Sequence, residues 1–265
     1  MTSQLQTAEL LNRLHTPGDP LIVTNVWDAI SAKIVAEAPG VKALASASHS
    51  VSFANGVPDN EGLTVDEAIR AARIITSAVD LPVSIDFEKG YAPDAAGVGA
   101  NVRRLIEETG AVGINLEDSL ESASGAQRSI EDSVARVAAA RAAGDATGIP
   151  LVINARVDTL AGGGEWDEAV TRANAYLDAG ADVIFFLGLR TEELVERAFD
   201  EVNGRISTIG GVGGIPLQRL AELGVSRVSF GPQTMGLALA GLQRAATTLS
   251  ARGEYPKDLS FSFAL

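Results

Sequence analysis

A (β/α)8 barrel is the fold class that this sequence predicts, on three observations. Short apolar runs alternate with alanine-rich amphipathic stretches along the 265-residue chain, the pattern of parallel strands connected by helices. About eight such repeats in roughly 250 residues is the size of this barrel. No linker or low-complexity tract separates a second unit, so we expect one domain over residues 1–265. A doubly wound open sheet is the alternative, but it normally has fewer strands and a glycine-rich first turn.

The predicted strands are short apolar segments bounded by polar residues or glycine. They are residues 21–24, 41–45, 83–86, 112–115, 151–154, 183–186, 206–209 and 225–230. Two long loops, 46–62 and 119–128, follow the second and fourth of these strands. Loops on that side of a barrel commonly form substrate walls or lids.

The helices between the strands carry recognisable start and stop signals. Thr64 with Glu67 three residues later is a capping box, which predicts a helix start. Ser129 caps a predicted helix at 130–143 that Gly144 ends, because glycine is favoured just past a helix end. Further helices are predicted at 165–179, 191–199, 215–223 and 233–251, and the first 14 residues are polar and helix-like.

Charged side chains end three apolar runs, where a buried strand normally holds none. Asp86 and Glu88, then Glu117, then Arg156 close the third, fourth and fifth predicted strands. Charge is costly to desolvate, and parallel strands of a barrel all end on one face. We therefore expect these four side chains to line one pocket, in which carboxylate oxygens suit Mg²⁺ better than zinc and the arginine binds an anion. The alternative is structural: Asp86 or Glu117 caps a helix or pairs with a lysine such as Lys89.

Composition excludes several classes of protein. The net charge of −13 argues against a nucleic-acid or anionic-membrane partner, each of which needs a basic face, but not against an anionic substrate. The absence of cysteine excludes disulfides, thiolate nucleophiles and cysteine metal sites. Neither a signal-peptide pattern nor an apolar run of ~20 residues is present, so we expect a cytoplasmic protein.

Five stretches, taken in order and spacing, resemble the isocitrate lyase / phosphoenolpyruvate mutase superfamily from Val23 to about Gly231. They are Asn25-Val26-Trp27-Asp28-Ala29 with Ser31-Ala32, Gly56-Val57-Pro58-Asp59, Asp86-Phe87-Glu88-Lys89-Gly90-Tyr91, Asn115-Leu116-Glu117-Asp118 and Asn154-Ala155-Arg156-Val157-Asp158. The resemblance implies a (β/α)8 barrel, Mg²⁺ with Mn²⁺ as a substitute, and a 2-oxo or 2-hydroxy acid substrate that reacts through a metal-bound enolate. It also implies a homo-oligomer, a dimer or tetramer, whose C-terminal helices pack on or swap with a neighbour.

The resemblance also implies roles for individual residues. Asp86 matches the direct metal ligand, Glu88 stands where many members have aspartate and should hold metal-bound water, and Glu117 matches another acid of the metal shell. Asp59 matches an acid that approaches substrate and metal from the second loop. Arg156 matches the arginine that binds the substrate.

Other candidates in the same loops have a structural reading beside the functional one. Ser48 and His49 fall near the backbone segment that holds the substrate carboxylate in the family, and His49 is either an acid/base or a hydrogen-bonded structural histidine. Tyr91 could reach the substrate or pack, and Arg128 could close over the ligand or lie in solvent. The stretch 210–214 is glycine-rich in a region that binds phosphate in many barrels, but it lacks a basic residue, so we do not favour phosphate there.

The loop 119–128 departs from the family pattern. Lyase members carry a Lys-Lys/Arg-Cys-Gly-His motif there, and mutase and phosphonopyruvate hydrolase members use lysine and asparagine, whereas this loop has no cysteine, histidine, lysine or asparagine. Loss of CO₂ from a chelated 2-oxo acid depends least on a loop acid. We therefore expect a Mg²⁺-dependent lyase or decarboxylase for a small 2-oxo or 2-hydroxy dicarboxylate such as oxaloacetate. The alternatives are a C–P mutase or hydrolase and a non-catalytic metabolite-binding homologue.

Overall fold

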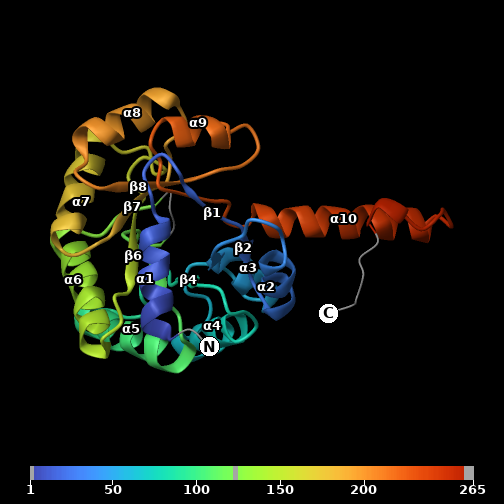
Figure 1. Ribbon diagram of the computed structural model, residues 1–265, viewed down its shortest axis with the longest axis horizontal. Helices are drawn as coiled ribbons and strands as arrows, with labels where there is room; N and C mark the ends of the chain where they lie inside the picture. The colour runs from blue at the N-terminus through green and yellow to red at the C-terminus, as the bar shows by residue number, and fades with distance from the viewer. Residues whose placement is uncertain (1–2, 122–124, 260–265) are drawn as a thin grey trace.

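The computed structural model describes residues 3–121 and 125–259, and its centre is a nearly closed barrel of parallel strands (Figure 1). The sheet order is β1-β9-β8-β7-β6-β5-β4-β3-β2. Only Thr24 separates β1 (Leu21–Val23) from β2 (Asn25–Val26), so one continuous stretch of chain joins the two ends of the sheet. The expected barrel class is therefore confirmed as an α/β barrel of this type.

The remaining strands are β3 (Leu44–Ser46), β4 (Val83–Asp86), β5 (Gly113–Glu117), β6 (Val152–Val157), β7 (Val183–Phe186), β8 (Arg205–Ile209) and β9 (Arg227–Ser229). The helices are α1 (Gln4–Leu14), α2 (Ala29–Ala36), α3 (Ser48–Ala54), α4 (Val65–Thr76), α5 (Ala95–Thr109), α6 (Ile130–Thr147), α7 (Trp166–Asp178), α8 (Glu192–Glu201), α9 (Leu217–Glu222) and α10 (Gln233–Ser250), followed by a 3-10 turn at Lys257–Leu259. No helix among the described residues is long and apolar enough to cross a membrane.

Helix α1 covers the end of the barrel at which the strands begin. Leu11 of α1 packs with Val23, Val112 and Val152 in one buried apolar cluster inside the barrel. Gly113 permits this contact, because a Cβ atom at that position would lie 2.7 Å from the Leu11 side chain. The opposite end, where the strands finish, is thus left for ligands.

The structure corrects two expectations about secondary structure. Gly144 does not end α6; the helix continues to Thr147, and Gly148 adopts the left-handed conformation at its end. Gly144 is buried instead, and a Cβ there would lie 3.1 Å from the Ile149 carbonyl oxygen, so close packing explains this glycine. The expected loop 46–62 contains a short helix, α3.

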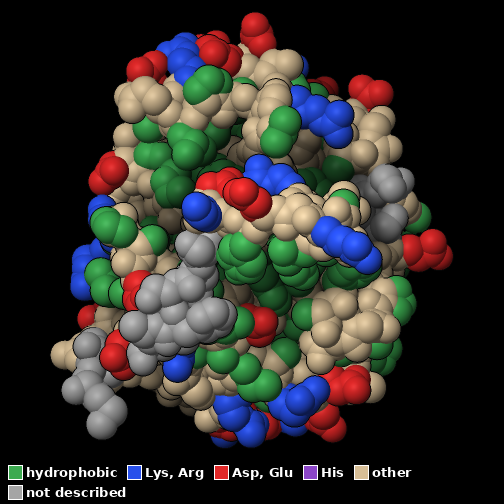
Figure 2. Space-filling model, turned by 90° about the vertical axis from the view of Figure 1, so that its right-hand side faces the viewer, with side chains coloured by type: hydrophobic (Ala, Val, Ile, Leu, Met, Phe, Trp, Pro, Cys, Tyr) green, Lys and Arg blue, Asp and Glu red, His purple; other side chains and the backbone are tan. Residues whose placement is uncertain are grey.

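Helix α10 extends away from the barrel rather than lying against it (Figure 1). Leu237 is 76% exposed and Leu242 is 67% exposed, so the helix presents large apolar side chains to solvent. Figure 2 shows the face from which α10 projects, with hydrophobic side chains gathered around a hollow near its centre. Such a surface commonly marks an interface.

Candidate active site

Asp86 ends β4 with one carboxylate oxygen held and the other free. Its Oδ2 accepts a hydrogen bond from the Ser48 backbone N–H at 2.9 Å, and its own N–H donates to the Ser46 hydroxyl at 2.8 Å. Its Oδ1 is buried and accepts no hydrogen bond from any described residue. An unpaired buried oxygen is costly, so this atom is suited to a ligand that the protein itself does not supply.

Glu88 lies two residues beyond Asp86 and is almost fully buried. Its Oε1 accepts a hydrogen bond from the Tyr91 hydroxyl, and its Oε2 accepts one from the Glu61 backbone N–H at 2.6 Å. Burial raises the pKa of Glu88 to about 7 against the opposing hydrogen bond from Tyr91, and the charge of Asp86 adds to the rise.

Glu61 also accepts a hydrogen bond from the Tyr91 N–H at 2.7 Å, which closes a ring of contacts between the two loops. Glu88, Tyr91 and Glu61 all have positive φ angles, a backbone conformation uncommon outside glycine. These residues therefore hold the loop after β4 in one specific shape. Glu61 was not predicted, because nothing in its polar loop distinguishes it.

Arg156 on β6 lies between two carboxylates. Its Nη1 is 2.6 Å from Glu117 Oε2 on the neighbouring strand, with which it is in register. Its Nε and Nη2 donate to the two oxygens of Asp158 at 2.6 and 2.8 Å. Burial alone would lower the pKa of Arg156, but Glu117 and Asp158 raise it above its ordinary value. Burial raises the pKa of Glu117, and Arg156 opposes that rise.

Asp118 supports this cluster from behind. It is buried; its Oδ1 accepts from the Asp158 N–H at 3.1 Å and from the Gln127 side chain at 3.0 Å, and its Oδ2 accepts from the Tyr176 hydroxyl at 2.8 Å. Asp118 thus fixes the position of Asp158, which in turn orients the Arg156 guanidinium. Neither acid was assigned a role from the sequence, although both lie directly beside predicted site residues.

The remaining candidates lie at different places around this cluster. His49 Nδ1 is 3.5 Å from Asp59 Oδ2, and the exposed imidazole stacks on Phe53. The Oδ1 of Asp59 is buried without a hydrogen-bond partner among the described residues. Arg128 pairs with Asp132 of α6 at 3.1 Å, and its Nε is buried without such a partner.

A buried cation lies in the barrel interior below Asp86. Arg227 of β9 is fully buried, and it donates long hydrogen bonds to Ser84 Oγ at 3.3 Å and Asn115 Oδ1 at 3.4 Å. No carboxylate of the described residues forms an ion pair with it. Burial lowers its pKa to about 10, against the opposing charge of Asp86, so it remains protonated at neutral pH. It therefore contributes positive potential beneath the acids. An arginine inside the predicted strand 225–230 was the signal that could have revealed it.

Whether these acids can hold a metal ion depends on which of their oxygens are free of protein hydrogen bonds. In residues 3–121 and 125–259, no three histidine, aspartate or glutamate side chains gather as a complete set of metal ligands. Magnesium nevertheless needs only one or two protein carboxylates, with water and substrate completing its shell. Asp86 fits a direct ligand through its free Oδ1. Glu88 and Glu117 already accept hydrogen bonds from protein groups, so they are suited to contact the metal ion through its water ligands.

Comparison with known proteins gives consistent matches over most of the chain. A family model described as phosphoenolpyruvate phosphomutase matches residues 11–250. The uncharacterized protein Rv1998c of Mycobacterium tuberculosis (strain H37Rv) is 32% identical over 94% of this chain and 92% of its own length. The 2-methylisocitrate lyase of Escherichia coli (strain K12) is 30% identical over 88% of this chain and 83% of its own length.

Among solved structures, a candidate lyase or mutase from Burkholderia cenocepacia J2315 matches with a TM-score of 0.89 and 33% identity, covering 98% of this chain and 94% of the other. A candidate phosphonomutase from the same strain matches with a TM-score of 0.86 and 34% identity, covering 92% and 99%. The two solved structures share the fold of this chain, and the names of these relatives describe different reactions or none.

Proposed function

The chain belongs to the phosphoenolpyruvate mutase/isocitrate lyase superfamily, and from that premise we propose that it is a Mg²⁺-dependent C–C lyase of decarboxylase type. Its substrate would be a small 2-oxo (or 2-hydroxy) dicarboxylate such as oxaloacetate. The observation that carries the proposal is the free, buried Oδ1 of Asp86 near a rigidly held arginine, Arg156. Together they suit a chelating, anionic ligand.

Each residue has a defined part in this proposal. Asp86 would bind the cation directly, and Glu88 and Glu117 would orient its water ligands. Bound Mg²⁺ would supply stabilisation of the negative charge that develops on the substrate oxygens. Asp158 occupies the Nε–Nη2 edge of Arg156 and Glu117 contacts Nη1, which leaves one N–H on each of Nη1 and Nη2 to bind a substrate carboxylate. Arg227 would add positive potential from below.

The loop 119–128 favours decarboxylation over aldol-type cleavage. Cleavage of a 2-hydroxy tricarboxylate needs a base to take the alcohol proton, and this loop has no cysteine, histidine or lysine. Departure of CO₂ from a 2-oxo acid needs no such base. His49 with Asp59 is an alternative acid/base pair outside this loop, with 3.5 Å between His49 Nδ1 and Asp59 Oδ2.

A C–P mutase or hydrolase is the second candidate. It is favoured by the family match over residues 11–250 and by the likeness to a candidate phosphonomutase at 34% identity. The loop 119–128 lacks the lysine and asparagine on which such members depend, which is why we place this reaction second.

The deciding experiment measures the product expected from each substrate, with and without Mg²⁺. These products are pyruvate from oxaloacetate or 2-methylisocitrate, glyoxylate from isocitrate, and phosphoenolpyruvate or pyruvate with phosphate from phosphonopyruvate. We expect Mg²⁺-dependent decarboxylation of oxaloacetate and no cleavage of either tricarboxylate. Faster turnover of phosphonopyruvate would establish the second candidate instead. Binding of Mg²⁺ and oxalate without any turnover would identify a non-catalytic metabolite-binding protein.

We also propose a homo-oligomer, a dimer or tetramer, in which α10 packs on or exchanges with a neighbouring subunit. The exposed leucines of α10 support this, because a projecting apolar helix gains most by burial against another copy. Light scattering of a Leu237→Glu, Leu242→Glu variant should show a smaller mass than wild type. Ile74→Glu, at an exposed position of α4, should not change the mass.

A further inference from the structure

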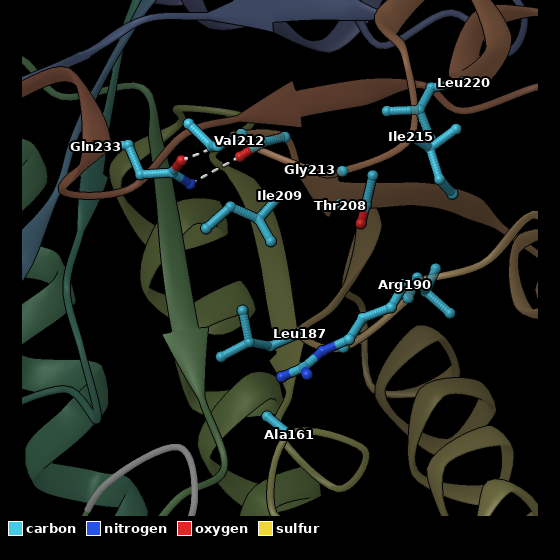
Figure 3. A pocket seen from close by; sticks show the side chains of 15 residues that line it. Ala161, Leu187, Arg190, Thr208, Ile209, Val212, Gly213, Ile215, Leu220 and Gln233 are labelled. Carbon is cyan, nitrogen blue, oxygen red and sulfur yellow. Dashed lines mark hydrogen bonds between the residues drawn. The ribbon is translucent and has the colours of Figure 1, made fainter. Parts of the chain in front are cut away.

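A second cavity opens on the same end of the barrel, away from the acids of β4 and β5. Its volume is about 530 Å³, and it lies between the loop after β7 and the glycine-rich loop 210–214 after β8 (Figure 3). Leu187, Ile209, Ile215 and Leu220 give it apolar walls. This volume falls within the range of small-molecule sites.

The glycine-rich loop is held in one shape by a side chain of α10. Gln233 donates from Nε2 to the Gly210 carbonyl at 2.9 Å and accepts at Oε1 from the Val212 N–H at 3.2 Å (Figure 3). Gly211 has a φ of +152°, and a Cβ atom there would lie 2.1 Å from the Gln233 Oε1. The loop is therefore preformed, and the cavity has a defined wall.

Two polar groups of the cavity have no partner of their own. The Thr208 hydroxyl is buried and makes no hydrogen bond with the described part of the chain, although the residue is only 1% exposed. Arg190 is exposed, and it has no hydrogen bond or ion pair with any residue that the structure describes. Figure 3 shows the Arg190 guanidinium extending across the cavity toward Leu187, and the Thr208 oxygen directed into the same space.

We propose that this cavity binds an oxyanion, a carboxylate or phosphate group of a small molecule, through Arg190 and Thr208. An unpaired guanidinium is matched to the planar geometry of such groups, and the buried hydroxyl would regain a hydrogen bond. The apolar walls suit the carbon part of the ligand. The sequence argued against an anion here because 210–214 lacks a basic residue; the structure brings one in from the preceding loop.

This proposal does not depend on the reaction at the acids. The oxyanion can come from the far end of a substrate whose other end lies near Asp86, or from a separate small molecule. Both sources present the same chemistry to Arg190. The protein has a net charge of −13, which would repel an anion, so the unpaired positive charge of Arg190 is what makes binding of an anion from either source favourable.

The test is calorimetric titration of the full-length protein with inorganic phosphate and with succinate. Arg190→Gln should weaken the binding of at least one of them by about tenfold or more, since a charge-assisted pair is lost. Thr208→Val, which keeps the shape, should weaken it several-fold. Arg70→Gln, an exposed arginine of α4, is the matched control and should bind as wild type does.

Repeating the titration in the presence of Mg²⁺ and saturating oxalate distinguishes the two possible sources of the oxyanion. Altered affinity assigns the cavity to the far end of a substrate, and unchanged affinity assigns it to a separate small anion. Thermal unfolding checks that each variant is folded. The proposal is overturned if wild type binds neither anion, or if folded Arg190→Gln binds both as tightly as wild type.

Discussion

At the end of the barrel where the strands finish, the half formed by β4 to β6 differs from the half formed by β7 and β8 in how its polar side chains are paired. On β4 to β6, charged side chains are crowded together and most of them are neutralised or hydrogen-bonded by one another, as Arg156 is by Glu117 and Asp158. On β7 and β8, glycines leave space, and Arg190 and Thr208 stand without partners in a cavity. In the first half the contacts hold the charged side chains in fixed positions. In the second half the space and the unpaired groups remain available to a ligand. In the proposed function, the reaction would therefore take place at β4 to β6, and the proposed oxyanion would be bound at β7 and β8.

The largest effect should come from Asp86→Ala in the charged half. Loss of the free Oδ1 removes the direct ligand, so we expect Mg²⁺ binding to disappear and activity to fall at least about a thousandfold. The fold should survive, because a strand-end carboxylate contributes little packing. Calorimetry measures the affinity for Mg²⁺, and Glu196→Ala, at an exposed acid of α8, is the control. Unchanged Mg²⁺ affinity in folded Asp86→Ala would refute the assignment.

Arg156→Lys should have the next largest effect. Lysine retains the charge but cannot contact Glu117 and both oxygens of Asp158 at once, so the fixed donor geometry is lost. We expect oxalate affinity in the presence of Mg²⁺ to fall roughly 10- to 100-fold. Arg103→Lys, within an exposed pair on α5, should leave it unchanged. Oxalate binding equal to wild type would mean that Arg156 serves the fold and not the ligand.

Gly211→Ala tests whether the two halves are independent. A Cβ atom would displace the Gln233 side chain and hold alanine at a φ of +152°, so we expect a loss of about 1–3 kcal/mol in unfolding free energy. Mg²⁺ affinity should not change, since the loop lies outside the acid cluster. Gly236→Ala, in open space within α10, should be neutral or stabilising. A parallel loss of Mg²⁺ affinity in Gly211→Ala would show that the halves are coupled.

The sequence predicted those features that depend on local pattern. The segments 83–86 and 183–186 are strands with the expected bounds. Glu117 at the end of β5 and Arg156 near the end of β6 lie in register on neighbouring strands, because strand period and strand order fix where such residues lie. Membership of the superfamily was likewise predicted correctly from the spacing of motifs.

Features that depend on packing between loops were not predictable. Arg190 lies about 20 residues before the glycine-rich loop, and only the side-by-side arrangement of β7 and β8 brings it to the cavity. Glu61 contacts Glu88 through a backbone N–H, which any residue type could supply. In both cases the type of one residue does not indicate its partner, because the partner is determined by how the fold brings distant loops together.

The smallest effect concerns the floor of the barrel, below both halves. His15 is buried at the end of α1; its Nδ1 lies 2.7 Å from the Leu11 carbonyl oxygen and must donate to it, which leaves Nε2 without a hydrogen. Burial lowers the pKa of His15 to about 3, and the charges of Arg227 and Arg205 add to the fall.

Between about pH 6.5 and pH 3 the unfolded chain therefore binds a proton at His15 that the folded chain does not, so the stability tied to this group is present above pH 6.5 and is lost as pH falls. At most this amounts to about 1.4 kcal/mol per pH unit. From pH 6.5 to pH 5, wild type should lose roughly 1–2 kcal/mol more than His15→Gln in urea unfolding. Mg²⁺ and phosphate affinities at pH 7.5 should be equal in the two proteins, because the floor supports both halves of the site without contacting their ligands. Parallel stability curves for the two proteins across this range would show that His15 is protonated in the folded state as readily as in the unfolded chain.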